Sequence, residues 1–183
     1  LEFADAIVIG DAENVWLQIL VDANNSNLQR IYQADRQANI EAVKYDRSIF
    51  SGKKYAPVLP VQFGRGCRFA CDFFSIHAFY GRSLIQRAVN NIVEEIASLE
   101  RKHIFFVDDN IAGNHDYARE LFKALIPLKI RWGSFASIAM TKDRELMELA
   151  RKSGCVELFI GFESIQQQNL DYSQKKWVRV EKM

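Results

Sequence analysis

The residues with the clearest capacity for chemistry are two cysteines in a short loop. Cys67 and Cys71 are separated by three residues, and a C-x3-C-x2-C pattern would place a third cysteine at position 74. Phe74 occupies that position. Closely spaced thiolates are typical ligands of iron–sulfur clusters and of zinc. The spacing therefore predicts a metal or cluster site that lacks one of its ligands.

Other side chains can complete such a site in different ways. Zinc requires two more ligands, which His77 with a distant aspartate or Cys155 would have to supply. His77 follows Phe74 by three residues, so its imidazole is also a candidate to replace the third cluster cysteine. The simplest alternative is that the two cysteines merely follow a strand and bind nothing.

Strands and helices alternate along most of the chain, and these elements must position the cysteine loop. Apolar runs predict strands, and apolar stripes with a helical period predict helices. Such alternation indicates βαβ units and a parallel sheet, so the fold class is predicted as α/β with parallel (β/α) repeats. The expected strands are 58–63, 104–107, 130–134 and 156–161, and the expected helices are 84–100, a segment capped by Asn114, a segment from Thr141 or Asp143 to Lys152, and one after Ser164.

Polar residues follow each expected strand. The carboxyl ends of parallel strands meet at one edge of the sheet, where α/β proteins place their active sites. The cysteine loop follows the first strand, and we expect it to meet the polar groups of the others there. Those candidates are Asp108, Asp109 and Asn110 after the second strand, Ser134 at the third, and Glu163 and Ser164 after the fourth.

The amino-terminal residues predict a separate unit. Residues 5–10 read as a short buried strand, and residues 15–20 carry the apolar positions of a helix. One strand and one helix cannot bury their own apolar faces, so the unit requires a sheet from a longer protein, and a chain that starts at Leu1 agrees with such an excerpt. Residues 23–56 are polar and predict a linker. The expected domains are therefore 1–22, 23–56 and 57–183.

Composition and net charge indicate which classes of partner and which compartment to expect for this protein. The 183 residues carry a formal net charge of +1, which predicts no nucleic-acid partner. The longest apolar runs, such as 104–107, are too short for a membrane span, and the start shows no signal pattern. Three cysteines, two of them close together, favour a metal site in the cytoplasm over a disulfide framework.

Several segments, taken together, resemble one protein family. They are VQFGRGC at 61–67 with CDF at 71–73, RAVNNIVEE at 87–95, IFFVDDN at 104–110, RWGS at 131–134, SGC at 153–155, GFES at 161–164 and ADAIVIGDAENVW at 4–16. The chain thus resembles the radical S-adenosylmethionine superfamily, and within it the cobalamin-binding branch. The resemblance implies half of a partial TIM-type barrel, preceded by the last strand–helix unit of a Rossmann-like cobalamin-binding domain.

The resemblance also implies an activity with its cofactors. In such proteins three thiolates hold a 4Fe–4S cluster, whose open iron binds S-adenosylmethionine for cleavage to a 5′-deoxyadenosyl radical. Cobalamin in the full-length protein would serve alkylation or rearrangement of a small or lipid-like substrate. The implied redox partner is an electron donor such as flavodoxin or ferredoxin. The cofactors carry the difficult chemistry, and the protein positions them.

Carried over by position, the resemblance assigns roles to individual residues. Cys67 and Cys71 would be cluster ligands, and Phe73 would lie near the adenine. The other expected cofactor contacts are Asp108, Asp109 and Asn110 near the methionine ammonium, Ser134 at the same edge, and Glu163 and Ser164 near the ribose or amino group.

Phe74 departs from the family pattern at a position that the family's activity requires. A benzyl side chain has no lone pair for iron, so the first expectation is an impaired or absent cluster. An error in the codon for residue 74 comes second, and an alternative ligand third. Phe135 is a softer departure, because a polar residue is more usual there in the resembling proteins.

Two other functions compete with this enzyme. One is a pseudoenzyme or scaffold that keeps the fold without a working cluster. The weaker one is a receiver-like magnesium-binding α/β domain that uses Asp108 and Asp109. That second alternative requires a lysine after a later strand and leaves the cysteine loop unexplained.

Overall fold

The computed structural model describes residues 2–34, 38–41, 43–100 and 102–182. The chain divides into two compact units, residues 1–45 and 46–183. The predicted domain boundaries at 22 and 56 stay predictions.

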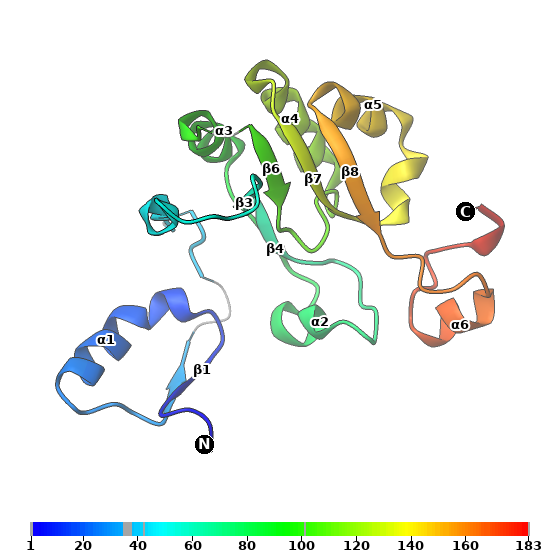
Figure 1. The fold of residues 1–183 in the computed structure, drawn as a ribbon. Coiled ribbons are helices and arrows are strands. Elements are labelled where there is room, and N and C mark those ends of the chain that lie inside the picture. The colour runs from blue at the N-terminus through cyan, green and yellow to red at the C-terminus, as the bar shows by residue number, and fades with distance from the viewer. Residues whose placement is uncertain (1, 35–37, 42, 101, 183) are drawn as a thin grey trace. The chain divides into compact units, whose positions relative to one another are not determined.

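The first unit is a strand–helix–strand element (Figure 1). Strands β1 (Ile7–Ile9) and β2 (Ile31–Gln33) pair in parallel, with Ile7 opposite Ile31. Between them a 3-10 turn, Ala12–Asn14, precedes helix α1 (Trp16–Asn24). The apolar side chains of α1 are largely exposed, as expected for a unit that cannot bury its own faces; they include Trp16, Leu17, Leu20 and Val21.

The second unit is built on a four-stranded parallel sheet in the order β3-β6-β7-β8. Its strands are β3 (Leu59–Val61), β6 (His103–Phe106), β7 (Arg131–Ala136) and β8 (Cys155–Ile160). Its longer helices are α3 (Val89–Ser98), α4 (His115–Leu125) and α5 (Arg144–Lys152), which lie together on one side of the sheet in Figure 1, and α6 (Gln167–Tyr172) follows β8. The sequential order of parallel strands is that of a (β/α) barrel. The predicted α/β class with parallel repeats is confirmed.

One predicted helix boundary is wrong. Residues 84–86, expected at the start of a helix, form strand β5 (Leu84–Gln86), which pairs antiparallel with β4 (Gly64–Gly66). The hairpin requires Gly66, which has a φ of 90° and lies so close to Ser83 O that a Cβ would be 2.4 Å from that oxygen. The unpredicted helix α2 (Ser75–Tyr80) and 3-10 turns at Arg47–Phe50, Ile126–Leu128, Ile138–Lys142 and Val180–Lys182 complete the unit.

Side-chain caps fix the starts of two helices where the sequence predicts them. Asn114 Oδ1 accepts the backbone N–H of Asp116 at 3.1 Å, at the start of α4. Asp143 Oδ1 accepts the backbone N–H of Leu146 at 3.0 Å, at the start of α5. These bonds satisfy N–H groups that have no partner within the helix.

The two faces of the sheet have different surroundings. Toward the helices, Trp132 is buried and packs against Phe106 and Phe122, with ring centroids 5.6 and 5.0 Å away. On the other face Phe105, Phe135 and Phe159 contact one another, and the last two remain exposed. No helix in the described ranges is both long and apolar enough to cross a membrane.

Candidate functional site

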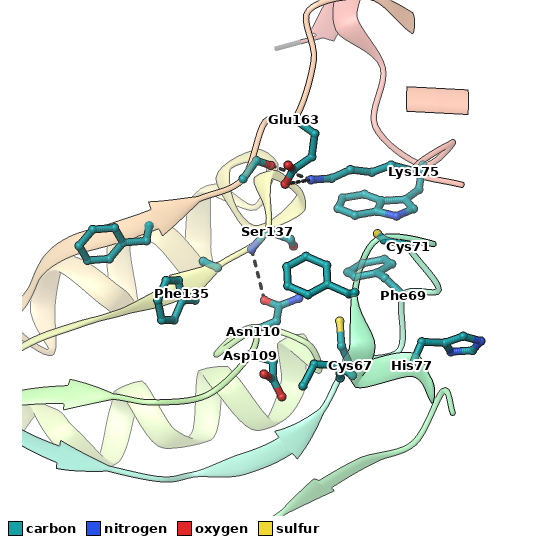
Figure 2. Close-up of a pocket in the computed structure, with 16 residues that line it drawn as sticks. Cys67, Phe69, Cys71, His77, Asp109, Asn110, Phe135, Ser137, Glu163 and Lys175 are labelled. Carbon is teal, nitrogen blue, oxygen red and sulfur yellow. Dashed lines mark hydrogen bonds and ion pairs between the residues drawn. The ribbon is translucent and has the colours of Figure 1, made fainter. Parts of the chain in front are cut away.

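The predicted edge of the sheet carries a pocket of about 260 Å³ (Figure 2). The cysteine loop forms one wall, and the segments after β6, β7 and β8 form the others, together with residues that follow α6. The pocket brings together Cys67, Cys71, Asp109, Asn110 and Glu163. Convergence at the carboxyl ends of the strands is the arrangement that the sequence predicts.

The two cysteines are both free thiols at the pocket wall. Cys67 is partly buried, and Cys71 is only 6% exposed. Burial raises the pKa of both thiols, and the Lys175 ammonium acts in the opposite direction on Cys71. Both thiols are therefore more protonated in the pocket than in water, and a bound cation would favour their thiolate forms.

Phe74 leaves the cysteine pair without a third ligand. Its ring is 54% exposed and lines the pocket beside them. Within the described ranges, no group of three or more His, Cys, Asp and Glu side chains is arranged to hold a metal ion. The residues present thus fit two corners of a three-thiolate cluster site and do not fit the third.

Of the alternative ligands that the sequence offers, His77 lines this pocket and Cys155 does not. His77 Nδ1 is 2.9 Å from the carbonyl oxygen of Gly81, and its ring points away from Cys67 in Figure 2. Cys155 packs against the core on β8, where burial raises the pKa of its thiol to about 11. Neither side chain supports a zinc site with Cys67 and Cys71.

The two aspartates after β6 have different surroundings. Asp108 is buried, and its carboxylate accepts the backbone N–H groups of Phe63 and Gly64. Burial raises the pKa of Asp108 to about 7. Asp109 lines the pocket and accepts the N–H of Gly66 at 3.1 Å, and burial raises its pKa as well. Asp108 therefore holds the strand before the cysteine loop, and Asp109 holds the loop itself. This division does not support a shared magnesium site.

Asn110 and Ser134 connect neighbouring strands. Asn110 is 6% exposed, and its Oδ1 accepts the backbone N–H of Ser137 at 3.3 Å. Ser134 is fully buried, and its Oγ donates to the carbonyl oxygen of Phe106 at 2.9 Å. Of the two, Asn110 lines the pocket. Ser134 stabilises the pairing of β6 and β7 beneath it.

Glu163 and Ser164 diverge after β8. Glu163 lines the pocket with a φ of 62°, and its Oε1 is 3.2 Å from Lys175 Nζ. Lys175 also donates to Gly161 O at 2.7 Å. Ser164 lines a second hollow, which it shares with Glu163, and its Oγ accepts the N–H of Gln166 at 3.0 Å.

Aromatic rings form much of the remaining wall. Phe69 stacks on Trp177 with centroids 4.0 Å apart, and Phe135 and Phe159 line the pocket from the sheet. Phe73 is half-exposed, and its ring packs against that of Phe74 with the ring centroids 4.9 Å apart. The roles that the resemblance assigns to Phe73, Asp108, Asp109, Asn110, Ser134, Glu163 and Ser164 stay predictions.

Lys175 and Trp177 are pocket residues that the sequence did not reveal as such. They lie in a polar carboxyl-terminal stretch without a recognisable period, which predicts no site. Only the return of this stretch to the cysteine loop, shown by the Asp72 N to Ser173 O bond at 3.3 Å, places them at the pocket. For Lys175 no sequence signal was available.

Fold and site together define an α/β protein with successive (β/α) repeats and a cysteine-bearing pocket at the carboxyl ends of its strands. Solved structures share this fold. A radical S-adenosylmethionine methyltransferase, TsrM from Kitasatospora setae, matches with a TM-score of 0.58 and 17% identity, over 62% of this chain and 23% of that one. Another structure of the same enzyme has cobalamin and a [4Fe-4S] cluster bound.

Curated proteins show similarity in sequence. A bacteriochlorophyllide d C-12(1)-methyltransferase of Chlorobaculum tepidum is 26% identical over 171 residues, 87% of this chain and 38% of that protein. The hopanoid C-3 methylase of Methylococcus capsulatus is 28% identical over 74% of this chain and 27% of its own length. An anaerobic magnesium-protoporphyrin IX monomethyl ester cyclase of Cereibacter sphaeroides is 28% identical over 75% of this chain and 25% of its own length.

These comparisons confirm the resemblance to the cobalamin-binding branch of the radical S-adenosylmethionine superfamily. No family model matches the chain. The chain spans between a quarter and two fifths of the length of these three curated relatives.

Proposed function

We propose that this chain is part of a cobalamin-dependent radical S-adenosylmethionine enzyme that alkylates or rearranges a small or lipid-like substrate. The observation that supports it most is the meeting of Cys67 and Cys71 with Asp109, Asn110 and Glu163 in one pocket. The named relatives are methyltransferases, methylases and cyclases, which agrees with alkylation or ring formation. An electron donor such as flavodoxin or ferredoxin is part of the proposal.

The pocket residues have distinct tasks in this proposal. Cys67 and Cys71 would hold two corners of a 4Fe–4S cluster, and a bound cluster would supply the electron for cleavage of S-adenosylmethionine. Asp109 and Glu163 present carboxylates to the ammonium group of that cofactor. Asp108 positions the cysteine loop by accepting the backbone N–H groups of Phe63 and Gly64, which precede the loop. The aromatic residues give the pocket an apolar wall.

The first unit supports the part of the proposal that concerns cobalamin. The β1–α1–β2 element has parallel strands and a helix with exposed apolar side chains. A strand–helix–strand unit of this kind is the repeating element of a Rossmann-like domain. Residues 1–22 are accordingly proposed as the closing part of such a cobalamin-binding domain.

A second candidate function follows from Phe74. Its ring occupies the pocket wall at the third ligand position, so a scaffold or pseudoenzyme that keeps the half-barrel without a cluster is the competing proposal. The two candidates differ in one property, which is whether a single ligand restores the cluster.

Anaerobic reconstitution with iron and sulfide tests both. The unmodified chain should hold well under one cluster, and Phe74→Cys should raise iron and sulfide toward four each per chain. The same variant should cleave S-adenosylmethionine to 5′-deoxyadenosine when supplied with a reductant. Phe73→Cys, one residue away, is the matched control and should not raise the iron content.

Two results would contradict different parts of this proposal. If Phe74→Cys folds but loads no more iron than the unmodified chain, the pocket does not build a cluster and the scaffold is favoured. A full cluster with cleavage in the unmodified chain would instead show that Phe74 does not impair the site.

A further inference from the structure

Two buried N–H donors at the pocket have no hydrogen-bond partner among the described residues. They are Asn110 Nδ2 and Trp177 Nε1. Burial of a donor without an acceptor costs free energy comparable to a lost hydrogen bond. Both residues line the pocket that contains Cys67 and Cys71. An acceptor that appears only when the site is in use would explain both groups.

The orientation of the Asn110 amide follows from its neighbour. The backbone N–H of Ser137 can only donate, so the atom at 3.3 Å from it must be the amide oxygen. The NH2 group is thereby turned to the other side. In Figure 2 this nitrogen lies on the side of Asn110 that faces Cys67. The donor is fixed in place before any ligand arrives.

Trp177 is fixed by stacking. Its ring lies against Phe69, which belongs to the same loop as both cysteines, at a centroid distance of 4.0 Å and an interplanar angle of 17°. Lys175 Nζ lies 5.6 Å from the centroid of the Trp177 ring. The Lys175 ammonium is also close enough to Cys71 to lower the pKa of that thiol. Burial has the largest effect on both thiols and raises the pKa of each. The nearby Asn110 and Trp177 N–H groups, which do not reach full hydrogen-bond geometry, act in the opposite direction on the pKa of Cys67 and Cys71, respectively.

We propose that Asn110 Nδ2 and Trp177 Nε1 donate hydrogen bonds to the sulfurs of Cys67 and Cys71, respectively, when these bind metal as thiolates. The two residues are positioning residues that stabilise negative charge on sulfur. A thiol is a weak acceptor, whereas a thiolate bound to a cation accepts a charge-assisted bond. Hydrogen bonds to cluster sulfurs tune the reduction potential of the metal centre. This inference rests on the proposal that both cysteines are metal ligands.

Cadmium-113 provides a test that needs no cluster. The ion is thiophilic and diamagnetic, so two-dimensional NMR of the nitrogen-15-labelled chain reports each donor separately. On addition of 113Cd²⁺, the Trp177 indole proton and the Asn110 amide protons should shift downfield and show coupling to cadmium through the sulfur. The indole protons of Trp132, which is bonded to Ser153, and of exposed Trp16 should not move.

Crossed variants identify the pairs. At Cd²⁺ concentrations that load the remaining cysteine, Cys71→Ser should abolish the response of Trp177 and leave that of Asn110, and Cys67→Ser should do the reverse. Trp177→Phe keeps a ring against Phe69 but removes the N–H, and should weaken Cd²⁺ binding roughly tenfold. Phe69→Leu, which keeps the N–H, should weaken it less.

The inference is overturned if the Trp177 and Asn110 protons shift no more than those of Trp16, or if either cysteine variant silences both while it still binds Cd²⁺. A chain that binds no Cd²⁺ also overturns it, since such donors must stabilise a metal-bound thiolate. The proposed enzyme is judged separately, by the iron content of Phe74→Cys, so failure of one leaves the other testable.

Discussion

Phe69 and Trp177 lie face to face, 4.0 Å apart, and join the cysteine loop to the segment after α6. The contact spans more than a hundred residues of sequence and closes one wall of the pocket. Stacked aromatic pairs contribute about 1 kcal/mol beyond the area they bury. The pair therefore helps to hold the cysteine loop against the carboxyl-terminal segment, together with the Asp72 N to Ser173 O bond.

Replacement of Trp177 should expose the buried thiol. Trp177→Ala removes the stack, so Cys71, now 6% exposed, should react roughly fivefold faster with a thiol reagent, which corresponds to about 1 kcal/mol of local closing free energy. Mass spectrometry of the labelled peptide measures this rate. Cys155, which packs against the core on β8, is the internal reference. Equal acceleration at both cysteines would indicate general unfolding instead.

The Asp108 carboxyl should make stability depend on pH. Burial raises its pKa from 3.8 to about 7 in the folded chain. The folded form then binds a proton that the unfolded form releases between about pH 4 and pH 7, so the free energy of unfolding should fall as the pH rises through this window, by up to about 1.4 kcal/mol per unit. Below that window the contribution is fully present.

Asp108→Asn removes this titration. Urea unfolding of the unmodified chain and the variant between pH 4 and pH 8 should give a steeper decline for the unmodified chain. Parallel curves for the two proteins would show that Asp108 does not titrate in this range.

Lys175 should stabilise the turn after β8. Its buried Nζ donates to Gly161 O at 2.7 Å and pairs with Glu163 at 3.2 Å. Lys175→Met keeps most of the side-chain volume and leaves both acceptors without this donor, so it should lower the free energy of unfolding by about 1–2 kcal/mol. Lys176→Met alters an exposed neighbour and is the matched control. A similar loss in both variants would contradict the assignment.

Much of this fold was predictable because its signals are local. Apolar runs marked β6 and β8, and Asn114 and Asp143 marked helix starts by capping chemistry that acts within three residues. The hairpin of β4 and β5 was not predictable in the same way. Leu84 and Ile85 fit the apolar stripe of the helix that follows, and only their pairing with Gly66 and Arg65 makes them a strand.

The sequence by itself determined the resemblance, the parallel repeats and the gap at Phe74, because residue type and spacing are sufficient for each. Tertiary structure decided which polar residues reach the pocket. It placed Asp109, Asn110 and Glu163 in the same pocket as the cysteines, kept Ser134 buried between β6 and β7, and added Lys175 and Trp177 from a stretch without a recognisable pattern. The physical reason is that burial and hydrogen-bond geometry depend on contacts between segments distant in sequence, which local patterns do not encode.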